Sequence, residues 1–320
     1  MATAVLTAQR VGRFRLVEEL GRGSTGSVFL ATQVGAGGRE VALKVLDSGI
    51  TSRPGFRERL ERDIRAVSAL SHPHILPVYE YGSAGELSYL VMPLVRGGTL
   101  RERLRNGPLP TEAAWRVLRQ VGEALHRAHQ VGVVHSDVKP GNVLFDVYGR
   151  VLLSDFGLAR THFGFARGTP GYMAPEQALG DEVDRRADVY ALAVLTFEML
   201  TGTRLFLAET PAELLQATVH APLPAAQDRC PGVPAGLDAA LLRGLARSPE
   251  RRYGSTMELL WALAPVLEGR SRRRRPRSPL RRPGREEVGF VPSVLVGEAD
   301  GAPEGAPGGD GRLEEVEPSA

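Results

Sequence analysis

The sequence predicts an α+β protein with two lobes, a first one rich in strands and a second, larger one that is mainly helical. Runs of β-branched and apolar residues indicate strands at 14–20, 28–31, 41–45, 79–81 and 88–92. Helical periodicity marks 54–70, 111–130, 188–200, 211–220, 237–247 and 256–267. The stretch 93–98, Pro-Leu-Val-Arg-Gly-Gly, is stiff and then flexible, which indicates a link between the lobes. The helix at 188–200 is almost wholly apolar and is therefore expected inside a large core.

Length and composition limit the class of protein. The 320 residues suffice for two domains or one bilobal domain, and 42% apolar residues can build a sizeable core. The single cysteine, Cys230, excludes an intramolecular disulfide and a cysteine-based zinc site. Residues 1–10 lack the apolar region of a signal peptide, and no run reaches the ~18 apolar residues of a membrane helix. We therefore expect a cytoplasmic protein without a transmembrane segment.

Lysine is almost absent from the chain. Of its 40 basic residues only Lys44 and Lys139 are lysines, and all the others are arginines. Arginine does not replace lysine where a compact charge on a flexible stem is required. The two lysines are therefore candidates for chemistry. The alternative, chance retention of two surface lysines, weakens because both lie inside motifs.

The stretch 135–157 carries the strongest chemical signal. Short apolar strands at 143–145 and 151–153, joined by a turn, predict a hairpin that holds its flanking polar residues rigidly. Those polar residues are Asp137, Lys139, Asn142 and Asp155. Carboxylate and amide oxygens suit Mg²⁺, and an ammonium suits a phosphate. The arrangement predicts phosphoryl transfer; the alternative is a surface hairpin with polar ends.

A glycine-rich turn lies between the first two strands. Gly21, Gly23 and Gly26 let the backbone approach phosphate oxygens and offer N–H groups that no Cβ obstructs. In a dinucleotide-binding fold this motif would open a helix, whereas here Val28 continues as an apolar strand, which favours a loop folded over ATP. Lys44 can reach the α- and β-phosphates if its strand pairs with the strands of the glycine turn.

Two predicted helices carry ionisable residues of interest. In the helix 54–70, Asp63 borders the buried face and is the acidic residue best placed to meet Lys44. His126 and His129, on or near the long helix of the second lobe, have no cysteine or acidic partner at ligand spacing. We expect them to pack in the interior rather than to bind a metal.

The composition changes near residue 268. Residues 270–285 hold nine arginines and three prolines, and residues 286–320 hold nine acidic residues against one arginine. Neither half can bury a core, so 268–320 is expected to be a disordered tail. The basic block could bind nucleic acid, an anionic membrane surface or an acidic partner; the alternative, which we favour, is a solvated tail neutralised by its own acidic half.

Six motifs resemble, in the same order, those of the eukaryotic-type serine/threonine protein kinases in the form common in bacteria. They are the glycine loop 21–28, Lys44, the catalytic loop 135–142, Asp155-Phe156-Gly157, Ala174-Pro175-Glu176 and Arg252. The resemblance implies the bilobal protein-kinase fold. Its parts would be an N-terminal extension 1–13 and a kinase domain 14–267, comprising an N-lobe 14–92, a hinge 93–98 and a C-lobe 99–267. The resemblance further implies an Arg252–Glu176 ion pair and a buried Asp188 that braces the catalytic loop.

The resemblance also implies roles for the polar residues. Asp137 would accept or orient the proton of the substrate hydroxyl, and Asn142 and Asp155 would hold Mg²⁺, with Mn²⁺ as the other candidate metal. Lys139 would steady the γ-phosphate, which points to serine and threonine rather than tyrosine substrates. Catalysis would then consist mostly of positioning and charge neutralisation.

The same resemblance assigns an adenine pocket. The residues expected to sandwich the base are Val28, Ala42 and Leu144. Met92 occupies the gatekeeper position. Pro93 replaces a common hinge glutamate, of which the family uses only the carbonyl, and Val95 supplies the required N–H.

Three departures from the family pattern qualify the picture. Asp63 stands where the family has a glutamate that pairs with Lys44, and its side chain is one C–C bond shorter, about 1.5 Å. Ser136 replaces the arginine that receives the activation-loop phosphate. Thr161 is the only hydroxyl residue of the activation loop, 158–167. We therefore expect activity that does not depend on activation-loop phosphorylation.

The function expected from the sequence is ATP- and Mg²⁺-dependent phosphorylation of serine and threonine in proteins, including autophosphorylation. The main rival is a pseudokinase scaffold, with Asp63 in its favour. A small-molecule phosphotransferase is disfavoured by 168–176, which resembles a segment that positions a peptide. Nucleic-acid binding through 270–285 is a lesser alternative. Related bacterial kinases form back-to-back dimers, so a homodimer is also considered.

Overall fold

A computed structural model gives the fold. It describes residues 10–23, 25–35, 37–51, 55–69, 71–156 and 168–268. The chain divides into two units, 1–273 and 274–320, and all the described residues belong to the first. The strands are β1 Arg10–Val11, β2 Phe14–Gly23, β3 Gly26–Gln33, β4 Glu40–Leu46, β5 Glu80–Ala84, β6 Leu87–Met92, β7 Val143–Phe145 and β8 Val151–Leu153. The helices are α1 Ser48–Thr51, α2 Phe56–Ser68, α3 Leu100–Leu104, α4 Thr111–Gln130, α5 Pro175–Leu179, α6 Arg186–Thr201, α7 Pro211–His220, α8 Ala226–Arg229, α9 Leu237–Gly244 and α10 Thr256–Leu267, with 3₁₀ turns η1 Pro140–Asn142 and η2 Pro249–Arg251.

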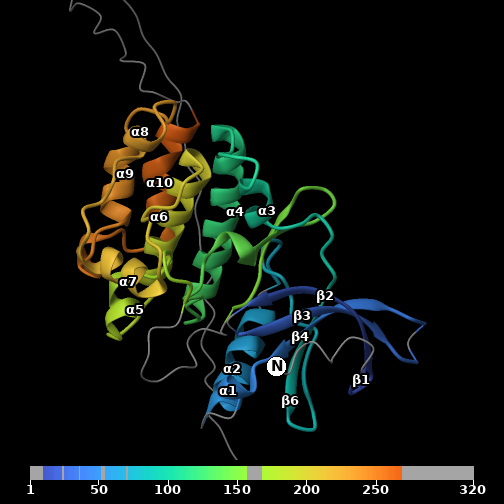
Figure 1. Cartoon of the computed structure of the whole chain (residues 1–320). Coiled ribbons are helices and arrows are strands. Elements are labelled where there is room, and N and C mark those ends of the chain that lie inside the picture. Colours follow the sequence, from blue (N-terminus) through green and yellow to red (C-terminus); the bar gives the residue numbers. More distant parts are fainter. Residues whose placement is uncertain are drawn as a thin grey trace, which may run out of the picture. The chain divides into compact units, whose positions relative to one another are not determined.

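The N-lobe is one antiparallel sheet with a helix packed on it (Figure 1). The strand order is β1-β2-β3-β4-β6-β5, so β4, which carries Lys44, lies in the interior of the sheet. Phe14 and Phe29 belong to its main apolar cluster. The α2 helix contributes Leu60, which is completely buried against Leu46 of β4 and Leu90 of β6.

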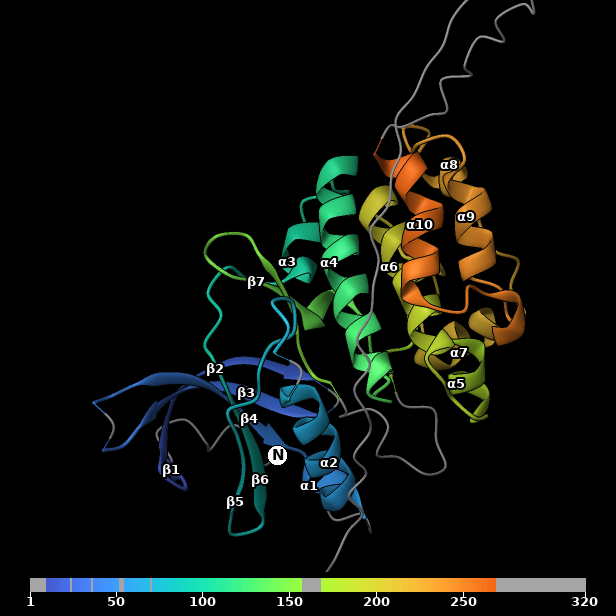
Figure 2. The same cartoon turned by 180° about the vertical axis from the view of Figure 1, so that it is seen from behind.

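The C-lobe is built around α6. Figure 2 shows α4, α6 and α10 side by side, and these three helices pack on one another. Nearly every side chain of α6 is buried, which confirms the expectation drawn from its apolar sequence. Arg186 and Glu198 are its residues that are only partly buried. Of its two acidic groups, Asp188 bonds the backbone of the catalytic loop and Glu198 bonds Tyr172, as described below.

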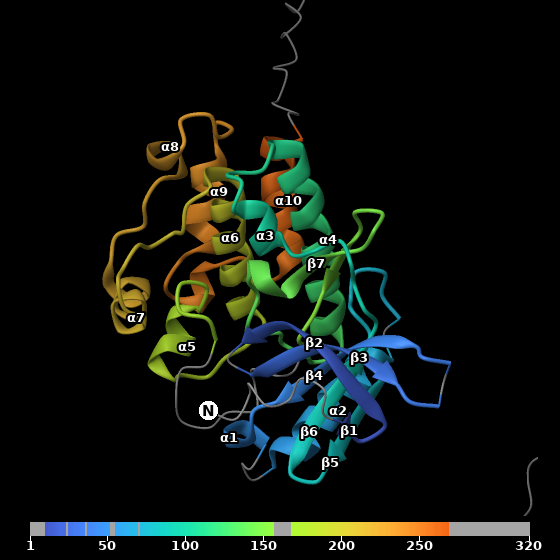
Figure 3. The ribbon, with the colours of Figure 1, turned by 45° about the vertical axis from the view of Figure 1, so that its right-hand side comes forward.

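The β7–β8 hairpin lies where the two lobes meet (Figure 3). Val143 pairs with Leu153 across it. The Leu76 N–H donates to the carbonyl of Leu153 at 2.9 Å, which ties the segment after α2 to the hairpin. Between β6 and α3, residues 93–98 run without regular secondary structure. The hairpin is therefore bonded to the chain that follows α2, and it begins directly after the catalytic loop, 135–142.

The α+β bilobal fold class is confirmed, and the differences from the sequence prediction are local. The short elements β1, α1, α3, α5 and α8 were not predicted, because two to five residues carry too little periodicity. The helix expected at 237–247 ends at Gly244. The predictions for the tail and for the activation loop fall outside the described residues. Among the residues described, no helix is both long enough and apolar enough to cross a membrane.

Candidate active site

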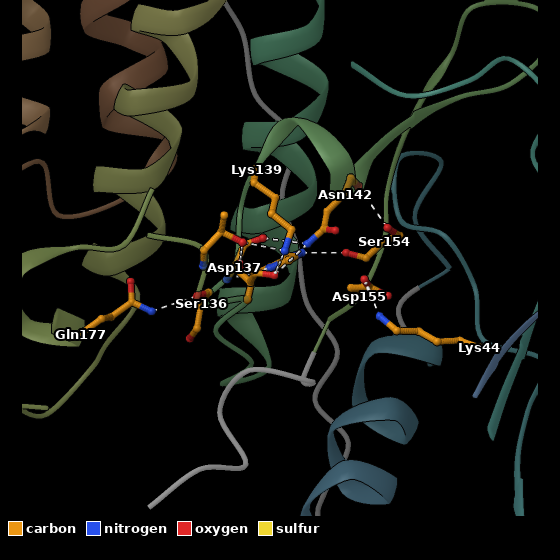
Figure 4. Close-up of polar contacts among 10 residues, drawn as sticks. Lys44, Ser136, Asp137, Lys139, Asn142, Ser154, Asp155 and Gln177 are labelled. Atoms are coloured by element: carbon orange, nitrogen blue, oxygen red, sulfur yellow. Dashed lines mark hydrogen bonds and ion pairs between the residues drawn. The ribbon is translucent and has the colours of Figure 1, made fainter. Parts of the chain in front are cut away.

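Asp137 is the centre of the hydrogen bonds in the catalytic loop (Figure 4). Its Oδ1 accepts from the backbone N–H and from the hydroxyl of Thr169, both at 3.0 Å. Its Oδ2 accepts from the Lys139 ammonium at 2.6 Å and from the Asn142 amide at 3.3 Å. Lys139 also donates to the Thr169 hydroxyl at 2.7 Å. The structure thus brings three predicted residues together and adds Thr169, to which the sequence assigned no role.

The loop that carries Asp137 is braced from α6. The buried Asp188 accepts hydrogen bonds from the backbone N–H groups of His135 and Ser136, both at 2.8 Å. It also bonds His129 Nε2 at 2.7 Å. Burial alone would raise the pKa of Asp188, but His129, with smaller contributions from His135, holds it below its usual value. The side chain of His129 is only 4% exposed, as expected, and its acidic partner lies 59 residues away in sequence, far beyond ligand spacing.

Ser136 occupies an unusual position in this loop. Its backbone has a φ of 63°, in the left-handed region, and its side chain is buried. The Ser136 hydroxyl has no hydrogen-bond partner among the described residues, whereas the Ser136 carbonyl accepts from the Gln177 amide at 2.9 Å. A short buried hydroxyl cannot reach out to a phosphate on another segment as an arginine can.

Lys44 and Asp155 form the ion pair that connects the sheet to the segment after β8. Lys44 Nζ lies 2.7 Å from Asp155 Oδ2, and the Lys44 side chain is only 3% exposed (Figure 4). Burial alone would raise the pKa of Asp155, but the charge and hydrogen bond of Lys44 hold it below its usual value. Asp155, two residues after β8, has a φ of 68°, which lies outside the β region. The chain therefore leaves the direction of the strand at this residue.

The expected Lys44–Asp63 pair is not formed in this structure. Asp63 is buried on α2, with Arg62 Nε 3.6 Å from its Oδ1, and no ion pair joins it to Lys44 among the described residues. A cavity whose lining includes Ile64 of α2 and Asp155 lies beside this helix. The shorter aspartate side chain agrees with this arrangement, in which Lys44 bonds Asp155 instead.

The three glycines of the glycine turn differ in their surroundings. Gly21 and Gly23, at the end of β2, have no atom within 4 Å of the position that a Cβ would take. At Gly26 a Cβ would lie 2.0 Å from the Val45 carbonyl oxygen, and φ is 143°. Gly26 is thus required by the close approach of β4, whereas Gly21 and Gly23 leave an open backbone surface that a phosphate could approach.

The residues predicted for adenine gather in one apolar cluster. The cluster joins Ala42 and Met92, which are register partners in β4 and β6, to the partly buried Val28, Val95 and Leu144. The Val95 N–H donates no hydrogen bond within the described part of the chain, so it is available to a ligand. Pro93, just after β6, contributes only a carbonyl. Both lobes therefore supply walls to this cluster.

Asn142 and Asp155 offer a donor set that fits a magnesium ion. The Asn142 amide nitrogen donates to the Asp137 carbonyl at 2.8 Å, which leaves its Oδ1 without a hydrogen bond among the described residues. Asp155 uses Oδ2 for Lys44, and its Oδ1 makes no hydrogen bond or ion pair within the described part of the chain. One amide oxygen and one carboxylate, completed by water and phosphate oxygens, are typical of Mg²⁺.

Two contacts anchor the segment 168–176 in addition to the Thr169–Asp137 bonds. Arg252 makes a buried bidentate ion pair with Glu176, both contacts at 2.6 Å, as the resemblance implied. Tyr172 donates its hydroxyl to Glu198 of α6. Sequence reasoning missed the Tyr172–Glu198 contact; its only signal was one acidic residue, Glu198, near the end of a mainly apolar helix.

A two-lobed fold with a lysine–aspartate pair between the lobes and an aspartate–lysine–asparagine cluster beneath it defines the protein kinase class. The family model for the protein kinase domain matches residues 14–240, and the chain belongs to this family. It is 38% identical over 271 residues to serine/threonine-protein kinase PknB of Mycobacterium leprae (strain TN), covering 80% of this chain and 43% of that protein. To serine/threonine-protein kinase Pkn1 of Myxococcus xanthus it is 40% identical over 274 residues, covering 82% and 39%.

Solved structures agree with the family assignment. The kinase domain of Mycobacterium tuberculosis PknI superposes with a TM-score of 0.69 at 30% identity, covering 83% of this chain and 100% of that one. A double mutant of the same domain gives a TM-score of 0.70 at 31% identity. The chain spans less than half the length of the curated relatives PknB and Pkn1.

Proposed function

We propose that the chain is an ATP- and Mg²⁺-dependent protein kinase that transfers the γ-phosphoryl group of ATP to serine and threonine hydroxyls of proteins. The observation that carries the proposal is the contact set of Asp137, whose two carboxylate oxygens are held by Thr169, Lys139 and Asn142. A carboxylate fixed in this way can orient a hydroxyl, and the ammonium beside it can share charge that develops on a phosphoryl group.

In this mechanism Asp137 accepts the hydrogen bond of the substrate hydroxyl and takes its proton as the new O–P bond forms. The bond to the bridging oxygen of ADP breaks in the same step, and Lys139 steadies the oxygens of the moving group. Lys44 exchanges Asp155 for the α- and β-phosphates, and the backbone of Gly21 and Gly23 covers them. Magnesium held by Asn142 and Asp155 would neutralise phosphate charge.

The rival proposal is a pseudokinase scaffold, and one observation favours it: Lys44 bonds Asp155 and not Asp63. The two functions separate in one experiment. The chain is incubated with ATP, Mg²⁺ or Mn²⁺ and a generic protein substrate. The amounts of phosphoserine and phosphothreonine formed are measured, and nucleotide binding is measured in parallel. A kinase transfers phosphate, and the Asp137→Asn variant does not; a scaffold binds nucleotide without transfer, and a small-molecule phosphotransferase consumes ATP only with a small acceptor.

Finer expectations belong to the same proposal. Autophosphorylation is expected, as is independence from activation-loop phosphorylation, since the buried Ser136 hydroxyl offers no charge to a phosphate. A Thr161→Ala variant should keep the wild-type kcat; a collapse would refute independence. We also propose a kinase domain spanning 14–267, a cytoplasmic location, a homodimer and an acidic partner for residues 270–285. Deletion of 268–320 tests the domain bounds and the acidic partner, fractionation tests the location, and sedimentation tests the homodimer.

A further inference from the structure

An arginine stands directly over the catalytic loop. The α3 helix packs against η1, the turn that contains Gly141. The guanidinium of Arg101, on α3, lies 3.5 Å from the position that a Cβ on Gly141 would take. Gly141 follows Lys139 by two residues and directly precedes Asn142. Because Gly141 has no side chain, nothing of the loop itself separates this exposed arginine from the loop backbone.

A second arginine shares the same surroundings. Arg204 follows α6 by three residues and is exposed. Burial raises the pKa of Glu198, and Arg204 and Arg101 both act against that rise. Burial raises the pKa of Tyr172 as well, and both arginines oppose that rise. Both guanidinium groups therefore lie within electrostatic range of the Tyr172–Glu198 pair, and Arg101 also lies over Gly141 of the catalytic loop.

The carboxylates near this surface are already engaged. Glu198 is partly buried and accepts the hydroxyl of Tyr172. Glu102, next to Arg101 in sequence, turns back to accept the Thr99 N–H at the start of α3. Within the residues that the structure describes, neither Arg101 nor Arg204 takes part in an ion pair. Arg101 beside the catalytic loop and Arg204 near the Tyr172–Glu198 pair are thus left with unused binding capacity for an anion.

We propose that Arg101 and Arg204 form a basic subsite that selects protein substrates with an acidic residue close to the phosphorylated hydroxyl. The proposal rests on the protein kinase function argued above and names its substrate class. The segment 168–176, which holds Tyr172 beside this surface, also contacts Asp137 through Thr169, so the subsite and the reacting hydroxyl share one platform. A carboxylate of the substrate pairs with a guanidinium, and a basic residue at the same place is repelled.

The test is the specificity constant for a set of threonine peptides with neutral flanks. Each peptide carries one glutamate or one arginine at one of three positions before or after the threonine. At one or more positions glutamate should raise kcat/KM about two- to fivefold over the neutral peptide, the size of an exposed ion pair, mainly through KM. Arginine there should lower kcat/KM, and the preference should shrink as salt rises.

Variants assign the preference to these residues. In Arg101→Gln and Arg204→Gln the glutamate-to-neutral ratio of kcat/KM should fall toward one. The matched control Arg229→Gln changes an exposed arginine of α8, a helix that packs on α6 and α9, and should keep the wild-type ratio. Melting temperatures equal to wild type exclude misfolding as the cause. Because the readout is a ratio within one variant, a general loss of activity does not imitate the predicted effect.

The outcomes separate this proposal from the kinase function itself. If wild type phosphorylates the neutral peptide but shows no glutamate preference at any position, the basic subsite is refuted and the kinase function stands. A preference that persists in both arginine variants refutes it equally. If wild type phosphorylates neither peptide nor protein, the kinase function fails and the subsite fails with it.

Discussion

Replacing Arg252 tests how much its buried hydrogen bonds contribute to the stability of the C-lobe. The side chain is completely shielded from solvent, and each of its five N–H groups has an acceptor. The Nε donates to the Ala246 carbonyl at 2.7 Å. The two terminal nitrogens donate to both Glu176 oxygens at 2.6 Å and to the carbonyls of Arg186 at 3.1 Å and Arg247 at 2.9 Å. One guanidinium thus closes a network among α5, α6 and the segment that follows α9.

The magnitude follows from the number of donors. In Arg252→Lys the charge is kept, but an ammonium has three donors at one point and leaves at least two buried acceptors unpaired. At about 1–3 kcal/mol for each of two unpaired groups, we expect the free energy of unfolding to fall by about 2–6 kcal/mol. Arg252→Met leaves the Glu176 carboxylate buried without a counter-ion, with an expected loss of about 3–5 kcal/mol.

Urea unfolding followed by circular dichroism measures these losses. Arg229→Lys, an exchange at an exposed arginine of α8, is the matched control and should lie within about 0.5 kcal/mol of wild type. The double variant Arg252→Met with Glu176→Leu should be more stable than Arg252→Met alone, because no unpaired charge remains. A loss below about 1 kcal/mol for Arg252→Lys, typical of a surface pair, would refute the reasoning.

Further predictions concern the brace and the glycine turn. Asp188→Asn should turn an amide NH₂ toward a donor N–H of the catalytic loop. We therefore expect a loss of about 1–3 kcal/mol in the free energy of unfolding and a lower kcat. An unchanged urea midpoint would contradict this. The pKa values of Asp155 and Asp188 lie below their unfolded values, so both carboxylates stabilise the fold above about pH 4, and this contribution is lost as the pH falls further. Urea midpoints measured from pH 7 to 3 should therefore fall at the acidic end. The fall should be smaller in Asp188→Asn. Gly26→Ala should lower the melting temperature, whereas Gly23→Ala should leave it unchanged and raise the KM for ATP; equal melting temperatures would contradict the contrast.

The sequence predicted what depends on local pattern. The buried α6 followed from a nearly unbroken apolar run, and the β7–β8 hairpin followed from two short apolar strands around a turn. The closeness of Asp137, Lys139 and Asn142 followed as well, because they lie within six residues of one loop. Order and spacing alone are sufficient for such contacts.

Contacts between distant segments were less predictable. Lys44 bonds Asp155 rather than Asp63 because the choice depends on where α2 rests against the sheet, and periodicity does not define that position. The partner of His129 is 59 residues away, and Thr169 reaches Asp137 across 32 residues. Ligand-spacing rules search nearby positions and therefore do not find pairs that only the packed fold creates.

The central claim is that Asp137 acts in phosphoryl transfer to a protein hydroxyl. Its most direct test is kcat for wild type and Asp137→Asn at saturating ATP and Mg²⁺, with phosphoserine and phosphothreonine counted by mass spectrometry. The amide keeps the size of the side chain but cannot take the proton, so kcat should fall by about 10²–10⁴-fold while ATP still binds. Equal kcat values for the two proteins, or no phosphate transfer by wild type, would contradict the claim.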